Sequence, residues 1–474
     1  MKTAEKIYTA STSEDRDASR LAERLARQIE DDIASSNIPP GGVMGSLREL
    51  SERYSVGRAA AREAVALLER RGLGRLRPGP YGGFIVAKPE AGAIGTALAD
   101  YFRMVGVSRG VVGDAREAFD LTVADHLTGL APGRELLETL PLADAARSKS
   151  LWHVMLRTAL TRLTGEPVLL LFGACLDELT LELLSDDVSP QDWRQEAARL
   201  RADLVEALVA RDATAVHQAM ALLHDALGSW AGDRGEGLAL PDIDTARHAD
   251  DRTLAVLVAR RIAHEILHKR SPGHRLGSEW DLCEQYNVSR ATLRQAIRQL
   301  QDSGLVECRR GRGNGMVVRD PRGTGSIRLV LAFLISHQTD PGSVGTLLFR
   351  LNRFMPALAV ARAAPKKRAR LVALLAQAER RDPIERMDLL RLVQLVSELS
   401  DSPIIDLFSR CLAAYEARFQ TALAESLPAH LQAEYFALLH RLLAEAATGE
   451  ATPLDRAKHD SARVMLDMSR KRPL

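Results

Sequence analysis

The chain has few aromatic residues, few cysteines and almost no net charge, and each shortage argues against a class of protein. Aromatic residues make up 4% of the 474 residues, while Ala, Leu, Arg and Glu abound, so the composition favours helix over sheet. The four cysteines have no CxxC spacing, which argues against disulfides and a compact zinc site. With a net charge of +2, any contact with nucleic acid must come from local clusters of charge.

Long hydrophobic runs are also missing. The longest, Val168 to Leu176, is too short to cross a bilayer, and the N-terminus has no apolar segment of the kind that a signal peptide needs. We therefore expect a cytoplasmic protein with no membrane partner, associated with the nucleoid if it binds DNA. Its length suggests three or four domains.

One stretch of the sequence occurs twice. Gly45–Pro89 aligns without a gap with Gly277–Pro321 at an offset of 232 (290 − 58), and 18 of the 45 positions are identical. Unrelated segments of this length would share about three residues. A second match, LTGEPVLLLFGACL at 163–176 with LSDSPIIDLFSRCL at 399–412, lies at an offset of 236. The pattern indicates a tandem duplication of one large unit.

Each copy of the stretch has the pattern of a helix, a turn, a second helix and a hairpin. Ser46 or Ser278 can cap the short first helix, and the second helix begins near Gly57 or Ser289 and ends at a glycine. Two short apolar segments then flank a Gly-rich turn, which predicts a β-hairpin. Each copy is therefore predicted to be a winged helix-turn-helix domain.

We predict a mainly α fold in which two winged helix-turn-helix domains are each followed by an all-helical bundle. Helical patterns are visible near residues 115–129, 143–163, 167–184, 190–210 and 212–230, and again from about 344 to the end. The expected parts are a disordered N-terminus (1–16), winged domain 1 (17–90), bundle 1 (91–230), a linker (231–250), winged domain 2 (251–321) and bundle 2 (322–474).

The predicted second helix carries the residues that could read DNA. A helix-turn-helix places the first residues of this helix against base edges in the major groove, where Arg can bond guanine and Ser or Thr can bond base or phosphate. Wing residues can follow the phosphate backbone. The candidate DNA contacts are Ser46, Arg48, Gly57, Arg58, Arg62, Arg77 and Gly79 in the first copy, and Ser278, Ser289, Arg290, Thr292, Arg294, Arg310, Gly311 and Arg312 in the second.

Four other interpretations compete with DNA binding. The arginines could form only a solvated helix face. A nucleotide-binding loop at GRGNG is disfavoured because no GK[ST] follows it. An enzyme is not expected, because no nucleophile-and-base set or cofactor fingerprint is present. A protein–protein interaction scaffold built from degenerate winged domains stays open, since Ala59, Ala60 and Trp280 weaken the contact set.

The quoted residues resemble the winged domain of GntR-type bacterial regulators. The second copy reads LGSEWDL and VSRATLRQAI, and the first reads MGSLREL and VGRAAAREAV. The helical regions that follow resemble the FCD effector domain of the FadR branch. This resemblance implies a transcriptional regulator, expected to be a repressor, that binds a double-stranded operator and a small-molecule effector. The family's DNA-facing Arg is kept as Arg48 but is Trp280 in the second copy, so we expect unequal contacts, with more base readout from the second copy.

Domains of the FCD type often hold a divalent metal through an Asp and three histidines. Here His153 and His224 fit two of the histidines, but Lys149 and Arg201 stand at the other two positions, and in the second unit His440 fits one. Because cationic replacements repel a metal, we expect no metal and no other cofactor. We expect Lys149 and Arg201 to pair directly with an acidic metabolite. The chain could act as a pseudo-dimer or form a homodimer.

Overall fold

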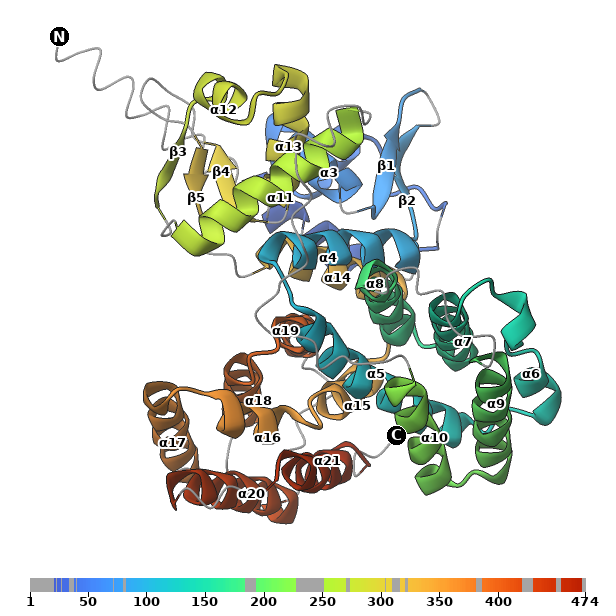
Figure 1. Cartoon of the computed structure of the whole chain (residues 1–474). Helices are drawn as coiled ribbons and strands as arrows, with labels where there is room; N and C mark the ends of the chain where they lie inside the picture. Colours follow the sequence, from blue (N-terminus) through green and yellow to red (C-terminus); the bar gives the residue numbers. More distant parts are fainter. Residues whose placement is uncertain are drawn as a thin grey trace, which may run out of the picture. The chain divides into compact units, whose positions relative to one another are not determined.

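The structure of the protein is a computed structural model, and its elements follow one another as Figure 1 shows. It describes residues 21–22, 24–26, 28–33, 38–39, 41–70, 72–79, 82–183, 193–226, 251–269, 273–302, 304–308, 316–319, 323–380, 386–419, 429–448 and 453–470. The chain divides into two compact units, Met1–Ile94 with Arg328–Thr339, and Gly95–Ile327 with Asp340–Leu474. The predicted N-terminal tail and linker lie outside the described residues.

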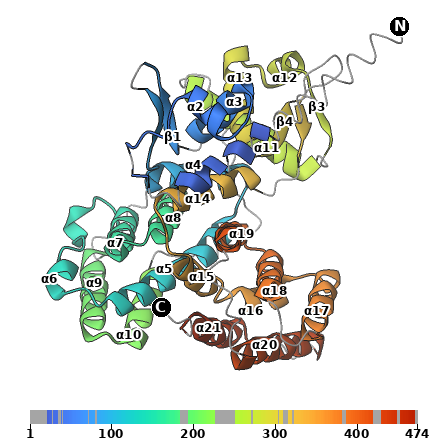
Figure 2. The same cartoon turned by 180° about the vertical axis from the view of Figure 1, so that it is seen from behind.

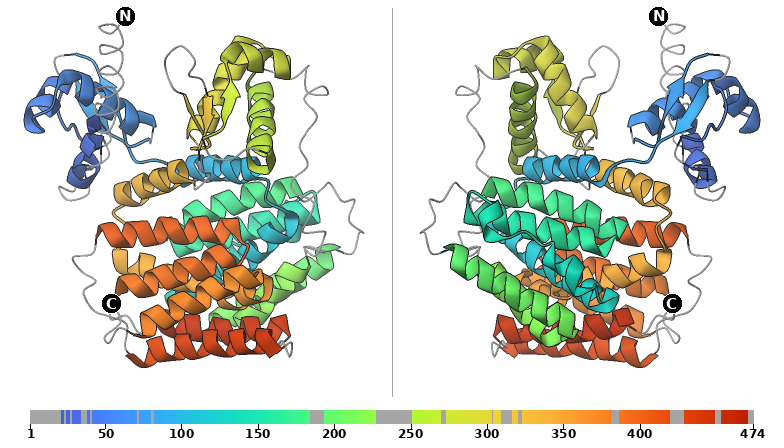
Figure 3. Two further views of the ribbon diagram at one scale, coloured as in Figure 1. Left: turned by 90° about the vertical axis from the view of Figure 1, so that its left-hand side faces the viewer. Right: turned by 90° about the vertical axis from the view of Figure 1, so that its right-hand side faces the viewer.

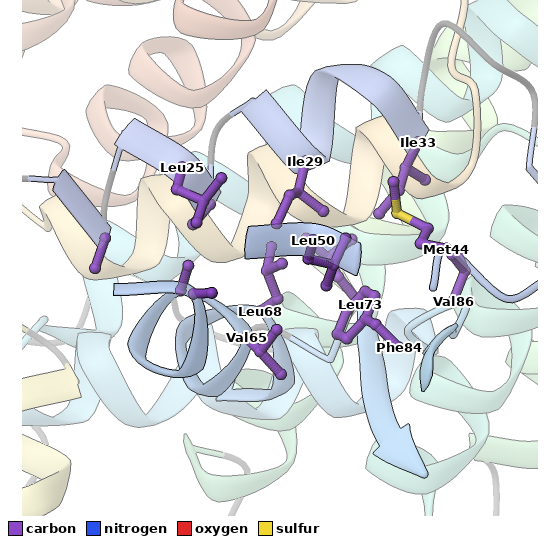
Figure 4. Close-up of a cluster of buried hydrophobic side chains, with 14 of the residues drawn as sticks. Leu25, Ile29, Ile33, Met44, Leu50, Val65, Leu68, Leu73, Phe84 and Val86 are labelled. Carbon is purple, nitrogen blue, oxygen red and sulfur yellow. The ribbon is translucent and has the colours of Figure 1, made fainter. Parts of the chain in front are cut away.

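Winged domain 1 has the expected elements. A helical segment within residues 21–33 precedes α2 (Leu47–Arg53), α3 (Arg58–Arg70), β1 (Gly74–Arg77) and β2 (Gly83–Val86). Their apolar faces meet in one core, because the four-residue spacing of Leu25, Ile29 and Ile33 places these side chains on one face of a helix. Figure 4 shows this core, which also contains Met44, Leu50, Val65, Leu68, Leu73, Phe84 and Val86. Ala332, from a helix much later in the chain, packs against the same cluster.

Winged domain 2 repeats this order with one more strand. Its elements are α11 (Asp251–Lys269), β3 (Arg275–Gly277), α12 (Glu279–Tyr286), α13 (Arg290–Asp302), β4 (Val306–Cys308) and β5 (Met316–Val318). The strands form an antiparallel sheet in the order β3, β5, β4. In winged domain 1 a single bridge between Val43 and Ile85 takes the place of the third strand. Both hairpins that the sequence predicts are thus present.

Bundle 1 consists of helices with short connections. They are α4 (Ala91–Val105), α5 (Arg109–Leu130), α6 (Arg134–Glu138), a 3₁₀ turn η1 (Ala143–Ala145), α7 (Lys149–Thr164), α8 (Pro167–Leu183), α9 (Trp193–Ala210) and α10 (Ala213–Asp225). Ser108 and Ser148 cap α5 and α7, and Gly165 ends α7 in the left-handed conformation that glycine adopts without strain. Helix α5 packs against α7, α8 and α10 and so forms the centre of the bundle.

Bundle 2 is built in the same order. Its helices are α14 (Thr324–Ser336), α15 (Pro341–Leu351), α16 (Met355–Arg362), α17 (Pro365–Glu379), α18 (Arg386–Leu399), α19 (Pro403–Arg418), α20 (Ala429–Thr448) and α21 (Leu454–Arg470). Figure 2 shows α16 to α21 in orange and red. Helix α5 contacts α15 and α19, and Figure 3 shows the orange and red helices of bundle 2 beside the blue and green helices of bundle 1.

The mainly α fold with two winged domains confirms the sequence prediction, but the short helix α6 and two longer helices were missed. No helix was expected at α4 or at α14. Helix α4 contains Gly92 and Gly95, which lower helix propensity, and the LVLAFLI run of α14 has no polar face from which a helical period could be recognised. None of the described helices is long and apolar enough to span a membrane.

Candidate DNA-reading surfaces and effector sites

The first helix of each helix-turn-helix begins with a capping box. The Ser46 side chain accepts a hydrogen bond from the backbone N–H of Glu49 (3.3 Å), while the Glu49 carboxylate accepts from the backbone N–H of Ser46 (2.7 Å). Ser278 and Asp281 make the same pair of bonds in the second copy. These bonds lower the pKa of both carboxyl groups. The two serines, predicted as caps and as DNA contacts, therefore fix where the first helix starts.

The second helix starts differently in the two copies. In winged domain 2 the Ser289 hydroxyl oxygen accepts from the backbone N–H of Thr292 (3.1 Å) and lies 2.7 Å from the Thr292 hydroxyl. The Thr292 side chain is only 1% exposed, and Ala60, its equivalent, is buried as well. The Thr292 hydroxyl therefore serves the helix start, and the contact of Thr292 with DNA stays a prediction. The difference between Ala60 and Thr292 concerns helix capping.

Two arginines lie on the exposed face of each second helix, near its start. Arg58 and Arg62 on α3, and Arg290 and Arg294 on α13, are all exposed. The Arg294 guanidinium lies 2.8 Å from the Glu279 carboxylate, a pairing that has no counterpart in the first copy because Leu47 stands at the position of Glu279 (279 − 232 = 47). Three of these four arginines thus have no ion pair with another described residue, and the fourth, Arg294, pairs with Glu279 of α12.

The two winged domains differ at the position where the resemblance to GntR-type regulators implies a DNA-facing arginine. Arg48 is exposed on α2 and forms an ion pair with Glu52 one helical turn later (2.8 Å). Its equivalent Trp280 is 60% exposed, which is unusual for so large an apolar side chain. A single exposed pair of this kind contributes little to stability, so Arg48 remains available to another anion.

The wing of winged domain 1 is a regular two-stranded hairpin. Its register pairs Gly74 with Val86 and Arg77 with Gly83. Arg77 is exposed beside Gly79, whose positive φ of 115° is a conformation that side-chain-bearing residues rarely adopt. In winged domain 2 the strands β4 and β5 frame residues 309–315. The predicted contacts Arg310, Gly311 and Arg312 therefore lie outside the described residues.

Comparison with known proteins agrees with this geometry. Residues 21–80 and 254–315 each match the family described as bacterial regulatory proteins, gntR family. The chain contains two GntR-type domains. Both matches begin in the helix before the capping box and end between the two wing strands, so each covers the helix-turn-helix and the first strand of the wing.

Two curated relatives share part of the chain. An uncharacterized HTH-type transcriptional regulator of Mycobacterium tuberculosis is 33% identical over 144 residues, which are 29% of this chain and 54% of that protein. RmpR of Mycobacterium gastri, also named as an HTH-type transcriptional regulator, is 39% identical over 83 residues, 17% of this chain and 27% of that protein. The chain thus spans about half of the first relative and about a quarter of the second. Both carry names of regulators rather than of enzymes.

A solved structure described as Streptococcus agalactiae GntR is similar as well. It is 16% identical, covers 45% of this chain and 96% of its own, and superposes with a TM-score of 0.33.

In bundle 1, which follows the first GntR-type domain, the two candidate histidines lie against an arginine that sequence reasoning missed. Arg157 Nη1 lies 3.2 Å from His153 Nδ1, and its Nη2 donates to the carbonyl oxygen of Leu223, the neighbour of His224. Since a guanidinium only donates, His153 Nδ1 accepts and its Nε2 carries the proton. Burial, and then the charge of Arg157, lowers the pKa of His153 well below its usual value and that of His224 to about 4.

Arg157 belongs to a buried ionic network that balances its own charges. Asp120 accepts from Arg157 Nε (2.7 Å) and pairs with Arg116 Nε (2.9 Å), and Arg116 Nη1 reaches Asp177 (2.6 Å). Two guanidinium groups thus face two carboxylates, and both arginines are at most 2% exposed. A divalent metal does not fit here, because the imidazole nitrogen that faces Arg157 is engaged and the other is protonated. Among the described residues, no group of three His, Cys, Asp or Glu side chains could hold a metal ion.

The two cations expected to hold an acidic effector have other partners. Lys149 Nζ lies 3.1 Å from the Glu196 carboxylate. Arg201 donates to the backbone carbonyl oxygens of Leu140 (3.0 Å) and Glu138 (2.7 Å). Each side chain thus ties neighbouring segments of bundle 1 together, and the direct pairing of both with an effector stays a prediction. In bundle 2, the exposed His440 likewise pairs with Glu379 (2.7 Å).

Bundle 2 contains a cavity that sequence reasoning did not find. It has a volume of about 480 Å³ and lies where α17, α18 and α19 meet. Arg370, Arg391 and Arg410 line it together with Glu398 and Asp406, which leaves one excess positive charge. Gln377, Gln394, Ala373, Leu374 and Leu395 complete the lining. Asp406 pairs with Arg410 (2.8 Å) and Glu398 with Arg370 (3.4 Å), so two of the three arginines pair with acids of the same lining. Because its residues come from three helices, no local motif marks the cavity in the sequence.

Proposed function

We propose that the protein is a DNA-binding transcriptional regulator in which each winged domain reads one segment of an operator. One observation carries this proposal: both stretches that match the GntR family fold into a capped helix-turn-helix with a wing and present exposed arginines at the start of the second helix. That is the part of a helix-turn-helix that enters the major groove. Arg58 and Arg290 are the residues that we assign to base reading.

The two readers are not equivalent. Winged domain 1 keeps Arg48 on its first helix, where winged domain 2 has Trp280, and we assign Arg48 to a phosphate contact. In winged domain 2 the ion pair between Arg294 and Glu279 must loosen before Arg294 can contact DNA. An asymmetric operator, with two half-sites of different sequence, fits such a protein better than a palindrome does.

Selection of DNA from a random pool with the purified full-length chain tests the proposal. We expect enrichment of a defined sequence, and binding to it should weaken as salt rises because cationic side chains displace counterions from phosphates. If no sequence is enriched, or if the chain binds no DNA at low salt, the proposal is wrong and the protein–protein interaction scaffold becomes the better interpretation.

The finer assignment is to the FadR branch, as a duplicated unit of winged domain and FCD-like bundle that acts as a repressor. It is supported by the matching order of helices in the two bundles and by the two sequence matches at offsets of 232 and 236. In this proposal a small acidic metabolite binds a bundle and changes the affinity of the chain for DNA. Transcription from a promoter carrying the selected sequence should rise when the gene is deleted.

We place the acidic effector in the cavity between α17, α18 and α19. Three arginines and two acids line it, which leaves one excess positive charge, whereas in bundle 1 the two buried arginines Arg116 and Arg157 are balanced by Asp120 and Asp177. A carboxylate or phosphate group suits such a lining, because guanidinium groups bind planar or tetrahedral anions through paired hydrogen bonds.

Calorimetry with a panel of dicarboxylates and phosphate esters tests this placement. We expect Arg391→Ala and Arg410→Ala to weaken binding of the best ligand at least tenfold. Lys149→Ala and Arg201→Ala are matched controls that remove a cation from bundle 1 and should leave binding unchanged. The opposite pattern, with loss only in the bundle 1 variants, would restore the site first expected from the sequence.

A further inference from the structure

The two bundles meet through a closely packed surface within the second compact unit. Helix α5 of bundle 1 contacts α15 and α19 of bundle 2. The rings of Phe172 and Phe408 stack at this surface, with centroids 3.7 Å apart and planes 4° from parallel. Both rings are fully buried. The bundles therefore share one continuous apolar core instead of touching through solvated faces.

Three ion pairs between described residues cross this surface in the same direction. Asp114 pairs with Arg362 (2.6 Å), Glu117 with Lys458 (2.8 Å) and Asp125 with Arg353 (2.5 Å). In each pair the acid belongs to bundle 1 and the base to bundle 2. The most enclosed pair is the last, since the Arg353 and Asp125 side chains are 1% and 9% exposed. Bundle 1 thus presents an acidic surface and bundle 2 a basic one.

The two surfaces occupy equivalent positions in the two copies. Ser108 caps α5 and Asp340 caps α15 at the same offset as the winged domains (108 + 232 = 340), and α5 and α16 end at Leu130 and Arg362 (130 + 232 = 362). On this alignment the three acids of bundle 1 correspond to Thr346, Phe349 and Ala357. Arg353 and Arg362 correspond to Leu121 and Leu130. Neither copy carries both partners of the Asp114–Arg362 pair or of the Asp125–Arg353 pair.

This arrangement differs from that of a symmetric dimer. In a two-fold interface the same patch occurs on both sides, so that each contact appears twice. Two copies of bundle 1 would set Asp114 and Asp125 against Leu130 and Leu121 in place of Arg362 and Arg353, and Asp125 would keep His217 of its own bundle (2.6 Å). Two copies of bundle 2 would leave Arg353 and Arg362 without acids. Burying such unpaired charges is costly, because each loses its hydration without gaining a partner.

We propose that the charges of the duplicated bundles favour pairing of bundle 1 with bundle 2 inside one chain, acidic surface against basic surface. Pairing of either bundle with the same bundle of a second chain is disfavoured. The partner of each surface is the other bundle of the same polypeptide. The chain is then a monomer that carries two winged domains. This inference does not depend on DNA binding, because it concerns only how the bundles associate.

Cleavage of the folded, full-length protein tests the pairing. A specific protease site is placed in the sequence between residues 231 and 249, the folded chain is cut there, and native mass spectrometry identifies which halves stay together. We expect the uncut chain to be a monomer of 51.9 kDa and the cut chain to be a complex of one N-terminal and one C-terminal half. An uncut dimer, or complexes of two N-terminal or two C-terminal halves, would overturn the proposal.

Charge exchange tests whether the ion pairs specify this association. Lys458→Glu and Glu117→Lys alter a partly exposed pair, so the chain should still fold. Each change alone should raise the dissociation constant of the two cut halves by about tenfold. The two changes together should recover at least half of that loss on a logarithmic scale. Arg134→Glu is the matched control, because Arg134 pairs with Glu206 on the exposed surface of bundle 1 and the change should leave the association unchanged. A double variant no better than the worse single variant would overturn the role of charge.

Discussion

The buried histidines of bundle 1 should make the protein lose stability in mild acid, and His224 allows the size of the effect to be worked out. Burial first, and Arg157 second, lowers the pKa of His224 from 6.5 to about 4 in the folded state. The unfolded chain therefore binds a proton below pH 6.5 that the folded chain does not accept until about pH 4. Stability that is present above pH 6.5 is lost as the pH falls through this window.

Between pH 7 and pH 5 the native protein should lose about 2 kcal/mol of unfolding free energy through His224, because the unfolded imidazole becomes mostly protonated while the folded one stays neutral. The assay is urea unfolding of the native chain and of His224→Gln, followed by circular dichroism at pH 8, 7, 6 and 5. The variant should lose less stability than the native chain over the same range.

The comparison at pH 8 controls for packing, because both side chains are then uncharged in the folded and unfolded states. Any constant difference between the two proteins there reflects the lost contacts of the imidazole. Only the change of that difference with pH reports on protonation. Parallel curves for the native chain and His224→Gln from pH 8 to pH 5 would refute the reasoning, and with it the conclusion that Arg157 and the imidazole lie together in a dry site.

Three further predictions concern the winged domains. Arg290→Ala should cost about 1–3 kcal/mol for the selected DNA and relax its preference at one base position, as measured by fluorescence anisotropy on single-base variants; an equal loss on random DNA would contradict the assignment. Thr292→Val should lower unfolding stability by about 1 kcal/mol, because it removes a buried hydroxyl contact with Ser289, but should leave the selected sequence unchanged. Trp280→Arg should strengthen binding to all sequences and steepen the salt dependence by about one counterion; an unchanged salt slope would remove Trp280 from the DNA-facing surface.

The winged domains could be predicted from the sequence because their signals are local. Ser46 and Ser278 each precede an acid three residues later, and this spacing alone determines the capping box that the structure contains. The Gly-rich segments between short apolar runs likewise predicted both hairpins. Comparison of the copies added the exposed arginines, because Arg58 and Arg290 stand at the same place in an otherwise altered helix.

Burial could not be read from the same pattern. Thr292 lies among exposed residues in the sequence, and only the packing of α13 against α11 and α12 shows that its hydroxyl faces inward. A side chain two residues further along a helix points to a different face, so its role depends on where neighbouring helices lie.

The surroundings of the candidate effector residues could not be predicted from the sequence, because the residues that meet there come from distant segments. Arg157 lies four residues after His153, but its significance depends on Asp120 and on the carbonyl oxygen of Leu223, which tertiary packing brings to it. The arginines of the cavity in bundle 2 belong to three helices. Their convergence is a property of the packed bundle and leaves no spacing that a sequence pattern could reveal.

A footprint of the selected DNA tests most directly the central claim that one chain carries two DNA readers. The native chain, Arg58→Ala and Arg290→Ala would each be bound to the same labelled duplex, and the protected segments compared at a concentration that saturates the native complex. We predict two protected segments for the native chain, with a different one weakened by each variant. Protection of a single segment, or loss of the same segment in both variants, would contradict the claim.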